Sequence, residues 1–329
     1  MTAVFTQIVH RQLRFIITLF LLLVSTPILF AAEPGDRGWT IGPSIGVHWG
    51  GAREIVYDNS GAENDNEYLS LLTWDLQPVV VMGIDARWES GKAGGLDLIF
   101  RSAIPGMATG EMNDYDWLTV NDPVPTYWSV SDIWMRWGFI FDAGYDWNLI
   151  SKGYFSLNAG LGYHFDWWAW RDITKDSSYG LVTGVSGIDY SAAYHVPMIS
   201  LMINLDCETF FINTNGRIGP VLAFSHDHHK LRTDPTFTGG PDNVDGLNFY
   251  DNAFGGPWID LEVSVGFRSK GKFSFELKGE YAWMRGTKGN SLVVFSDGVT
   301  SPILYKDAAG FAFQRIGVTA LFSWDLSGP

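Results

Sequence analysis

The segment IGPSIGVHWG, from Ile41 to Gly50, decides the fold because it alternates between two kinds of residue. Bulky side chains occupy the odd positions up to Trp49, whereas Gly, Ser and His occupy the even positions. The segment RIGVTALFSW, which ends at Trp324, follows the same rule. Successive side chains of a β-strand point to opposite faces, so a period of two predicts strands at both ends of the chain.

The second face of these strands indicates where they lie. It carries Gly, Ser and isolated charges, and aromatic residues cluster near the strand ends. A transmembrane β-barrel has this pattern, with an apolar outer face and aromatic girdles at the two membrane interfaces. A secreted β-sandwich or a soluble barrel would also alternate, but would bury its apolar face. The sequence therefore favours an outer-membrane barrel over these alternatives.

The N-terminal segment differs from the rest of the chain and predicts an export signal. Arg11 and Arg14 precede an apolar run from Phe15 to Phe30, and the segment contains no acidic residue. A basic start, an apolar core and a small-residue end are typical of a signal peptide. An uncleaved membrane anchor is the alternative interpretation. We expect a signal peptide at residues 1–32 and a single barrel domain at residues 33–329.

Composition excludes several classes of protein. The formal net charge is −14, and no cluster of Lys and Arg offsets it, so the chain would repel the phosphates of nucleic acid. The many aromatic and few charged residues argue against disorder and against a coiled coil. The one cysteine, Cys207, excludes an intramolecular disulfide and a Cys-based zinc cluster.

Turn signals divide the mature chain into ten predicted strands, an even number that suits a closed, up-and-down, antiparallel barrel. Alternate connections are short, and the others are long and rich in Asp, Asn, Gly and Pro. Short turns mark the periplasmic rim of such barrels and long loops mark the outer rim. The predicted strands are residues 39–57, 68–88, 96–117, 128–147, 154–173, 190–206, 210–231, 258–269, 273–285 and 311–324.

Two polar segments carry the side chains that are suited to chemistry. In the first, residues 112–117, alternation places Asp114 and Asp116 on one strand face together with Met112. Two carboxylates that are two residues apart on one face repel each other, so one of them can hold a proton near neutral pH. An Asp-x-Asp motif is weak by itself, and a solvated loop is the alternative.

The second polar segment is SHDHH, residues 225–229. Asp227 and His229 share the face that is predicted to line the lumen, whereas His226 and His228 point outward. A carboxylate beside a histidine can hold its ring, select its tautomer and raise its basicity, as a general base requires. A metal-binding loop is the alternative, although alternation splits the histidines between two faces and no nearby Glu completes a cage.

Three blocks lie at the outer ends of the first, third and seventh predicted strands. They are AREIVY at residues 52–57, MNDYDW at residues 112–117 and DHH at residues 227–229. With these blocks the chain resembles the omptins, the ten-stranded outer-membrane proteases of Gram-negative bacteria. No single block is specific, but their order and strand positions match the omptin pattern across nearly the whole mature chain.

The resemblance implies a mechanism. Asp114 and Asp116 form a carboxylate couple in it, and Asp227 and His229 form a dyad. A water molecule between Asp114 and His229 attacks the peptide carbonyl, and His229 takes its proton. Asp227 stabilises the imidazolium, and Asp116, if protonated, donates to the oxyanion. This chemistry needs no Ser nucleophile, metal or cofactor, and the substrate is a peptide or protein at the cell surface, outside the outer membrane.

The resemblance also implies a pocket for the substrate residue before the scissile bond. In the family this pocket carries two acids, of which one matches Glu54 and the other falls on Ser225 here. Met112 lines the same pocket with apolar surface. Glu54 alone holds a basic side chain less firmly than two acids do, so we expect a relaxed preference for basic residues.

Omptins also bind lipopolysaccharide through charged residues on the barrel exterior, and this chain departs from that pattern. After the matching Gly162 and Tyr163, Phe165 and Trp167 replace the acid and the base, and Ala193 stands where the family has an Arg. We expect outer-membrane lipid around the barrel, but not the family's form of dependence on lipopolysaccharide.

Other functions remain open at this stage. A binding or adhesion barrel would use the same loops without chemistry, and loss of His229 would leave it unharmed. A lipid-hydrolysing or lipid A-modifying barrel needs a nucleophile or base on the lipid-facing side of the rim, and no Ser-His-Asp arrangement stands there. Ten strands enclose too little space for a wide pore if side chains fill the lumen. We favour the protease.

Overall fold

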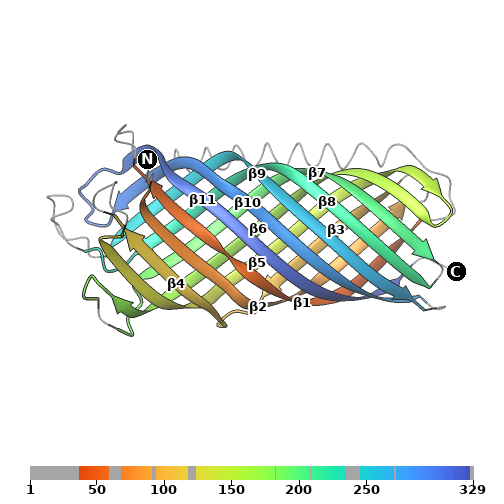
Figure 1. Ribbon diagram of the computed structural model, residues 1–329, viewed down its shortest axis with the longest axis horizontal. Coiled ribbons are helices and arrows are strands. Elements are labelled where there is room, and N and C mark those ends of the chain that lie inside the picture. Colours follow the sequence, from red (N-terminus) through yellow and green to blue (C-terminus); the bar gives the residue numbers. More distant parts are fainter. Residues whose placement is uncertain are drawn as a thin grey trace.

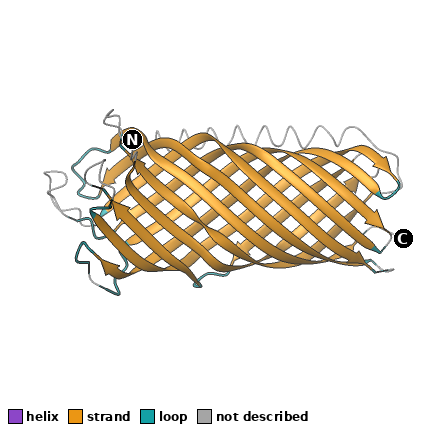
Figure 2. Cartoon of the chain, in the orientation of Figure 1, coloured by secondary structure: helices purple, strands orange, loops and turns teal. Residues whose placement is uncertain are grey.

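The computed structural model of the chain describes residues 37–58, 68–90, 94–117, 124–181, 183–207, 209–233, 245–269 and 272–326. The expected signal peptide at residues 1–32 lies outside this part. The regular structure of the described residues is β-strand throughout (Figure 2). No helix in these ranges is long and apolar enough to cross a membrane.

The strands form one antiparallel sheet that closes on itself, because β1 pairs with both β2 and β11 (Figure 1). The predicted up-and-down barrel is therefore confirmed. The strands of the described residues are β1 (Arg37–Tyr57), β2 (Tyr68–Ser90), β3 (Gly94–Ala103), β4 (Ala108–Asp116), β5 (Tyr127–Lys152), β6 (Phe155–Ser177), β7 (Ile188–Cys207), β8 (Phe210–His229), β9 (Leu247–Arg268), β10 (Phe273–Phe295) and β11 (Ile303–Asp325).

The strand count differs from the predicted ten at one place. The predicted strand at residues 96–117 is two strands, β3 and β4, which lie one after the other between β2 and β5. Pro105 and Gly106 form the turn between them, and Gly106 has a φ of 78°, which favours glycine. The ring therefore keeps the ten predicted positions, and the third of them is occupied by two strands.

Several strands also extend further than predicted, at the end of the barrel where β1, β4, β8 and β10 finish. We call this end the loop end and the opposite end the turn end. The strand expected from residue 258 begins at Leu247, and the strand expected from residue 311 begins at Ile303. Residues 247–257, which the sequence assigned to a loop, are therefore part of the barrel wall.

The outer surface of the barrel carries an apolar belt. Side chains such as Ile45, Met82 and Ile199 are about half exposed there. Water-soluble proteins rarely expose such a large continuous apolar surface. Exposed tryptophans flank the belt, with Trp324 toward the turn end and Trp49 toward the loop end. This is the arrangement of a transmembrane barrel, in which lipid covers the apolar belt.

The belt ends before the strands do. On β1 the outward positions change from Trp49 to the exposed Arg53, and on β9 they change from Phe254 to Asn252. The outward residue of β4 at the corresponding end is Asn113. Because these polar positions follow the belt, the ends of the strands at the loop end lie outside the membrane.

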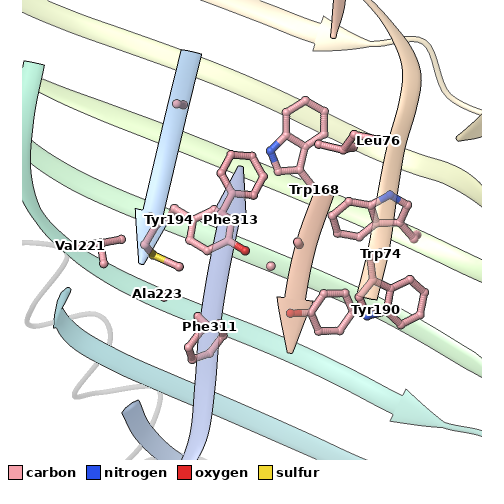
Figure 3. Packing of buried hydrophobic residues seen from close by; sticks show 14 of the residues in the cluster. Trp74, Leu76, Trp168, Tyr190, Tyr194, Val221, Ala223, Phe311 and Phe313 are labelled. Atoms are coloured by element: carbon pink, nitrogen blue, oxygen red, sulfur yellow. The ribbon is translucent and has the colours of Figure 1, made fainter. Parts of the chain in front are cut away.

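Large apolar side chains fill the lumen just below the loop end (Figure 3). Trp74 stacks on Tyr190 with ring centroids 4.9 Å apart, and Trp258 stacks on Phe313 at 5.5 Å. The small circumference of the ring allows such side chains to meet across the lumen. We call this group the aromatic layer: Trp74, Trp168, Trp170, Tyr190, Tyr194, Trp258, Phe311 and Phe313.

Toward the turn end the lumen is polar, and its charges are paired. Arg101 donates to Asp85 at 2.9 Å and to Glu280 at 2.5 Å. Arg217 bridges Asp142 and Asp260 in the same way, at 2.9 and 2.7 Å. These buried and partly buried side chains, which we call the ion-pair network, line or adjoin a polar cavity of about 770 Å³.

Candidate active site

The three sequence blocks meet at the loop end of the barrel. Strands β1, β4 and β8 all run toward this end and finish there at Tyr57, Asp116 and His229. Strand pairing places Glu54 opposite Leu72 and Leu72 opposite Asp114, so Glu54 and Asp114 lie at one level of the wall. The alternation of each strand then turns their carboxyl groups toward the interior, where both are buried.

The dyad residues are in direct contact. Asp227 and His229 lie on the interior face of β8, and Nε2 of His229 is 2.6 Å from Oδ2 of Asp227. The edge of the His229 ring packs on Phe249 of the neighbouring strand, with ring centroids 5.3 Å apart. Because Nε2 bonds to the carboxylate, Nδ1 is the ring nitrogen that can accept a proton from another molecule.

The other two histidines of the segment have different partners. His226 contacts Oδ1 of Asn248 at 2.9 Å and stacks on Tyr250 with ring centroids 4.5 Å apart. His228 contacts the backbone oxygen of Asp245 at 2.5 Å. Within the part of the chain that the structure describes, no group of three His, Cys, Asp or Glu side chains is arranged to hold a metal ion.

The two members of the carboxylate couple have unequal surroundings. Asp114 faces the interior and is 4% exposed, and its Oδ1 has no hydrogen-bond partner among the described residues. Burial and the neighbouring Asp116 carboxylate raise the pKa of Asp114 to about 8, against the opposing effect of the Arg232 guanidinium. These surroundings favour the protonated form of Asp114.

Asp116 is held by two donors that the sequence did not indicate. The hydroxyl of Tyr179 donates to its Oδ2, and Nη2 of Arg232 lies 3.4 Å from the same atom. Tyr179 itself stacks on Tyr127 with ring centroids 4.9 Å apart. No motif marks Tyr179, but Arg232 carried a signal, because it is the one Lys or Arg between residues 232 and 257 of an acidic stretch.

The pocket residues inferred from the resemblance are all buried in the interior near the loop end. Glu54 is 2% exposed, Met112 is fully buried, and Ser225 is 7% exposed. Burial, followed by the carboxylates of Asp227 and Asp251, raises the pKa of Glu54 well above its ordinary value. The acids of β1, β8 and β9 therefore lie close enough in the interior to repel one another.

Asp251 is the acid that sequence reasoning missed. It lies opposite Ser225 in the β8–β9 register, and the Ser225 hydroxyl is 3.5 Å from its Oδ2. Burial and the nearby Asp227 carboxylate raise the pKa of Asp251 to about 7, although Ser291 and Ser225 donate hydrogen bonds to it. No sequence pattern marks it, because turn signals predict a loop at residues 232–257, where an Asp is ordinary.

The fold and the site together define a transmembrane β-barrel that carries buried carboxylates and a histidine dyad at its loop end. The sequence profile of the Omptin family matches residues 36–326, and the chain belongs to this family. The resemblance found in the sequence is thereby confirmed. No curated protein sequence matches the chain.

Solved structures agree with this assignment at the level of the fold. The crystal structure of the outer membrane protease OmpT from Escherichia coli matches with a TM-score of 0.76 and 17% identity, over 89% of this chain and 99% of that one. The transport unit of the autotransporter AIDA-I from Escherichia coli matches at a TM-score of 0.32 with 9% identity, over 88% and 93% of the two chains. A score of that size does not define a shared fold.

Proposed function

We propose that this protein is an outer-membrane endopeptidase that hydrolyses peptide bonds with a water molecule activated by Asp227 and His229. The observation that carries the proposal is the 2.6 Å contact of the buried dyad at the barrel end where the Asp114 and Asp116 couple lies. Membership of the omptin family and the OmpT-like fold support it. A dyad beside a protonated carboxyl group is suited to general acid–base hydrolysis.

The first step is attack by water. His229 donates a hydrogen bond from Nε2–H to Asp227 and presents Nδ1 to a water molecule held between His229 and Asp114. As the water oxygen bonds to the peptide carbon, Nδ1 takes its proton, and the Asp227 carboxylate stabilises the imidazolium. When the C–N bond breaks, His229 returns this proton to the leaving amine.

The protonated carboxyl group has two tasks in this mechanism. One oxygen of Asp114 accepts a hydrogen bond from the water, and its hydroxyl donates to the developing oxyanion. The resemblance had given the donor role to Asp116, but the raised pKa belongs to Asp114. Asp116, fixed by Tyr179 and Arg232, contributes the negative charge that helps to keep the proton on its neighbour.

The substrate proposal follows from the charge of the site. Glu54 lies beside the dyad and attracts a basic side chain of a peptide or protein, while Met112 contributes apolar contact. Glu54 and Ser225 by themselves give a relaxed preference for basic residues. Long connections are typical of the outer rim of such barrels and support a site that faces the outside of the cell, with outer-membrane lipid around the belt.

Cleavage of peptides by the purified protein, reconstituted in membranes, tests the proposal. We expect His229→Ala and Asp114→Ala to abolish cleavage, a loss of at least about 10²–10⁴-fold, because each removes a group that activates or positions the water. The heat-resistant barrel, seen as the shift of the unheated protein in gel electrophoresis, stays intact.

His228→Ala is the matched control, since its ring contacts Asp245 on the other face of β8, and it retains activity. Equal losses in both histidine variants contradict the assignment of the base. Loss of cleavage in the presence of a chelator favours a metal site at the histidines instead. A wild-type barrel that cleaves no member of a broad peptide library favours a binding or adhesion barrel.

A further inference from the structure

Asp251 supplies a carboxylate directly beside Ser225, the position at which the family has its second pocket acid. The two residues are directly opposite each other on β8 and β9, and both side chains are buried in the interior. Adjacent strands lie about 4.8 Å apart, and directly paired side chains on one face contact each other. An acid at residue 251 therefore reaches the same part of the interior as an acid at residue 225 would.

Asp251 also belongs to the same electrostatic group as Glu54. The carboxylates of Asp227 and Asp251 both raise the pKa of Glu54. All three acids also raise the pKa of Tyr190, a member of the aromatic layer. The three acids come from strands β1, β8 and β9, so they approach the interior from different parts of the ring. A group placed among them meets carboxylates on more than one side.

These acids have unused hydrogen-bonding capacity. Oε2 of Glu54, Oδ1 of Asp251 and the Tyr190 hydroxyl have no hydrogen-bond partner among the described residues, and each side chain is at least nine-tenths buried. Within the described ranges, neither Glu54 nor Asp251 forms an ion pair with a Lys or Arg of the chain. Buried carboxylates of this kind are costly unless a cation neutralises them, so the arrangement is suited to a cation that arrives with a ligand.

We propose that Asp251 takes the place of the acid missing at Ser225 and, with Glu54, binds the cationic side chain of the substrate residue before the scissile bond. A guanidinium carries five N–H donors in a fixed fork, so it can bond to carboxylates on two sides at once. Met112 and Tyr190 offer apolar surface for the aliphatic part of the same side chain. The inference rests on the proposed function, and it replaces the relaxed preference expected from Ser225 with a retained preference for Arg and Lys.

A set of peptides that differ only in the residue before the scissile bond, with Arg, Lys, Gln or Ala, tests the inference. Asp251→Asn lowers kcat/KM for the Arg peptide by about ten- to a hundredfold, the usual effect of losing one charged hydrogen-bond partner. Cleavage of the Ala peptide falls much less, because its side chain makes no contact with Asp251, so the ratio of Arg to Ala cleavage drops by about the same factor. The double variant Ser225→Asp with Asp251→Ser returns the acid to β8 and restores the preference for Arg.

Asp132→Asn is the matched control for charge alone, since Asp132 is an exposed acid of β5 that pairs with Lys175 on the outside of the wall. It leaves the ratio of Arg to Ala cleavage unchanged. An Asp251→Asn enzyme that cleaves all four peptides with the wild-type ratios overturns the inference and leaves the proposed function standing.

Binding separates this inference from the proposed function. In the inactive His229→Ala protein, the affinity for the fluorescently labelled Arg peptide exceeds that for the Gln peptide, and adding Asp251→Asn removes the difference. If the wild-type protein cleaves nothing but this difference is present, the cation site stands and the peptidase proposal fails. If neither cleavage nor the difference in binding is found, both fail.

Discussion

The ion-pair network and the loop end of the barrel both bury carboxylates, but the network pairs them with Arg side chains, whereas Glu54 and Asp251 have no such partner among the described residues. In the network, Arg101 lies between Asp85 and Glu280 at hydrogen-bond distance. At the loop end, Glu54 and Asp251 are equally buried, and neither is paired with a Lys or Arg in the described part of the chain. Burial alone therefore does not distinguish the two regions; the presence of a partner does.

The difference indicates which charges serve the fold and which serve a ligand. A buried acid with a buried Arg is compensated within the chain, and its removal damages the barrel. A buried acid without a partner lowers stability and persists where function requires it. The aromatic layer separates the two regions, so the loop end keeps its uncompensated acids while the membrane-spanning part remains neutralised.

The largest expected effect is on stability, from Arg101→Met in the ion-pair network. This change leaves Asp85 and Glu280 without the cation between them and lowers the free energy of unfolding by about 3–5 kcal/mol. Denaturant unfolding of the protein in detergent measures it. Arg136→Met, which removes an exposed ion pair with Asp189 on the outer surface, is the control and has little effect. Equal unfolding curves for the two variants would remove the contrast between the regions.

The next expected effect is on the pH dependence of cleavage, and it tests the role of Asp114 at the loop end. Burial and the Asp116 carboxylate raise the pKa of Asp114 to about 8, so the protonated form that donates to the oxyanion is lost as pH rises through that value. The wild-type kcat/KM for a peptide with an uncharged residue before the scissile bond therefore falls above about pH 8.

Asp114→Asn cannot ionise, so its weaker remaining activity shows no such fall. The measurement is the pH profile of kcat/KM for both proteins. A peptide with an uncharged residue is used because its binding does not depend on the charge of Glu54 and Asp251. A variant profile that falls at the same pH as the wild-type profile would show that another group carries the proton.

The smallest expected effect is a gain in stability from Glu54→Gln. Burial and the neighbouring acids raise the pKa of Glu54, so the folded protein binds this proton more tightly than the unfolded chain does. The wild-type protein therefore loses stability as pH rises above the ordinary Glu pKa, and the Gln variant does not. At neutral pH we expect a gain of about 0.5–2 kcal/mol, which disappears in acid. A loss of stability at neutral pH would show that Glu54 is compensated.

The site shows where sequence reasoning succeeds. Asp227 and His229 were placed on one interior face because alternation along β8 is regular from Val221 to His229, and the structure keeps this parity. The same argument put Asp114 on the face of Met112, and the structure turns this face of β4 toward the interior. Local alternation needs no knowledge of the partner strands, so it can be read from the sequence alone.

The alternation is interrupted on β9, and no sequence pattern predicts the interruption. Strand β8 pairs Val221 with Gly256 but Leu222 with Phe254, so Gly255, with a φ of 95°, is an extra residue in the wall. This bulge turns odd positions such as Asp251 and even positions such as Trp258 to the same interior. The apolar half of each strand was expected to face lipid, and the bulge is one reason why Trp258 packs in the lumen instead.

The sequence by itself determined the closed barrel, the family and the strand faces of the dyad, because these follow from alternation and from short motifs within single strands. Only the tertiary structure decided that Asp251 stands beside Ser225, that burial raises the pKa of Asp114, and that Tyr179 and Arg232 contact Asp116. Each of these depends on strand register and on burial, and both are set by contacts between residues that are far apart in the chain.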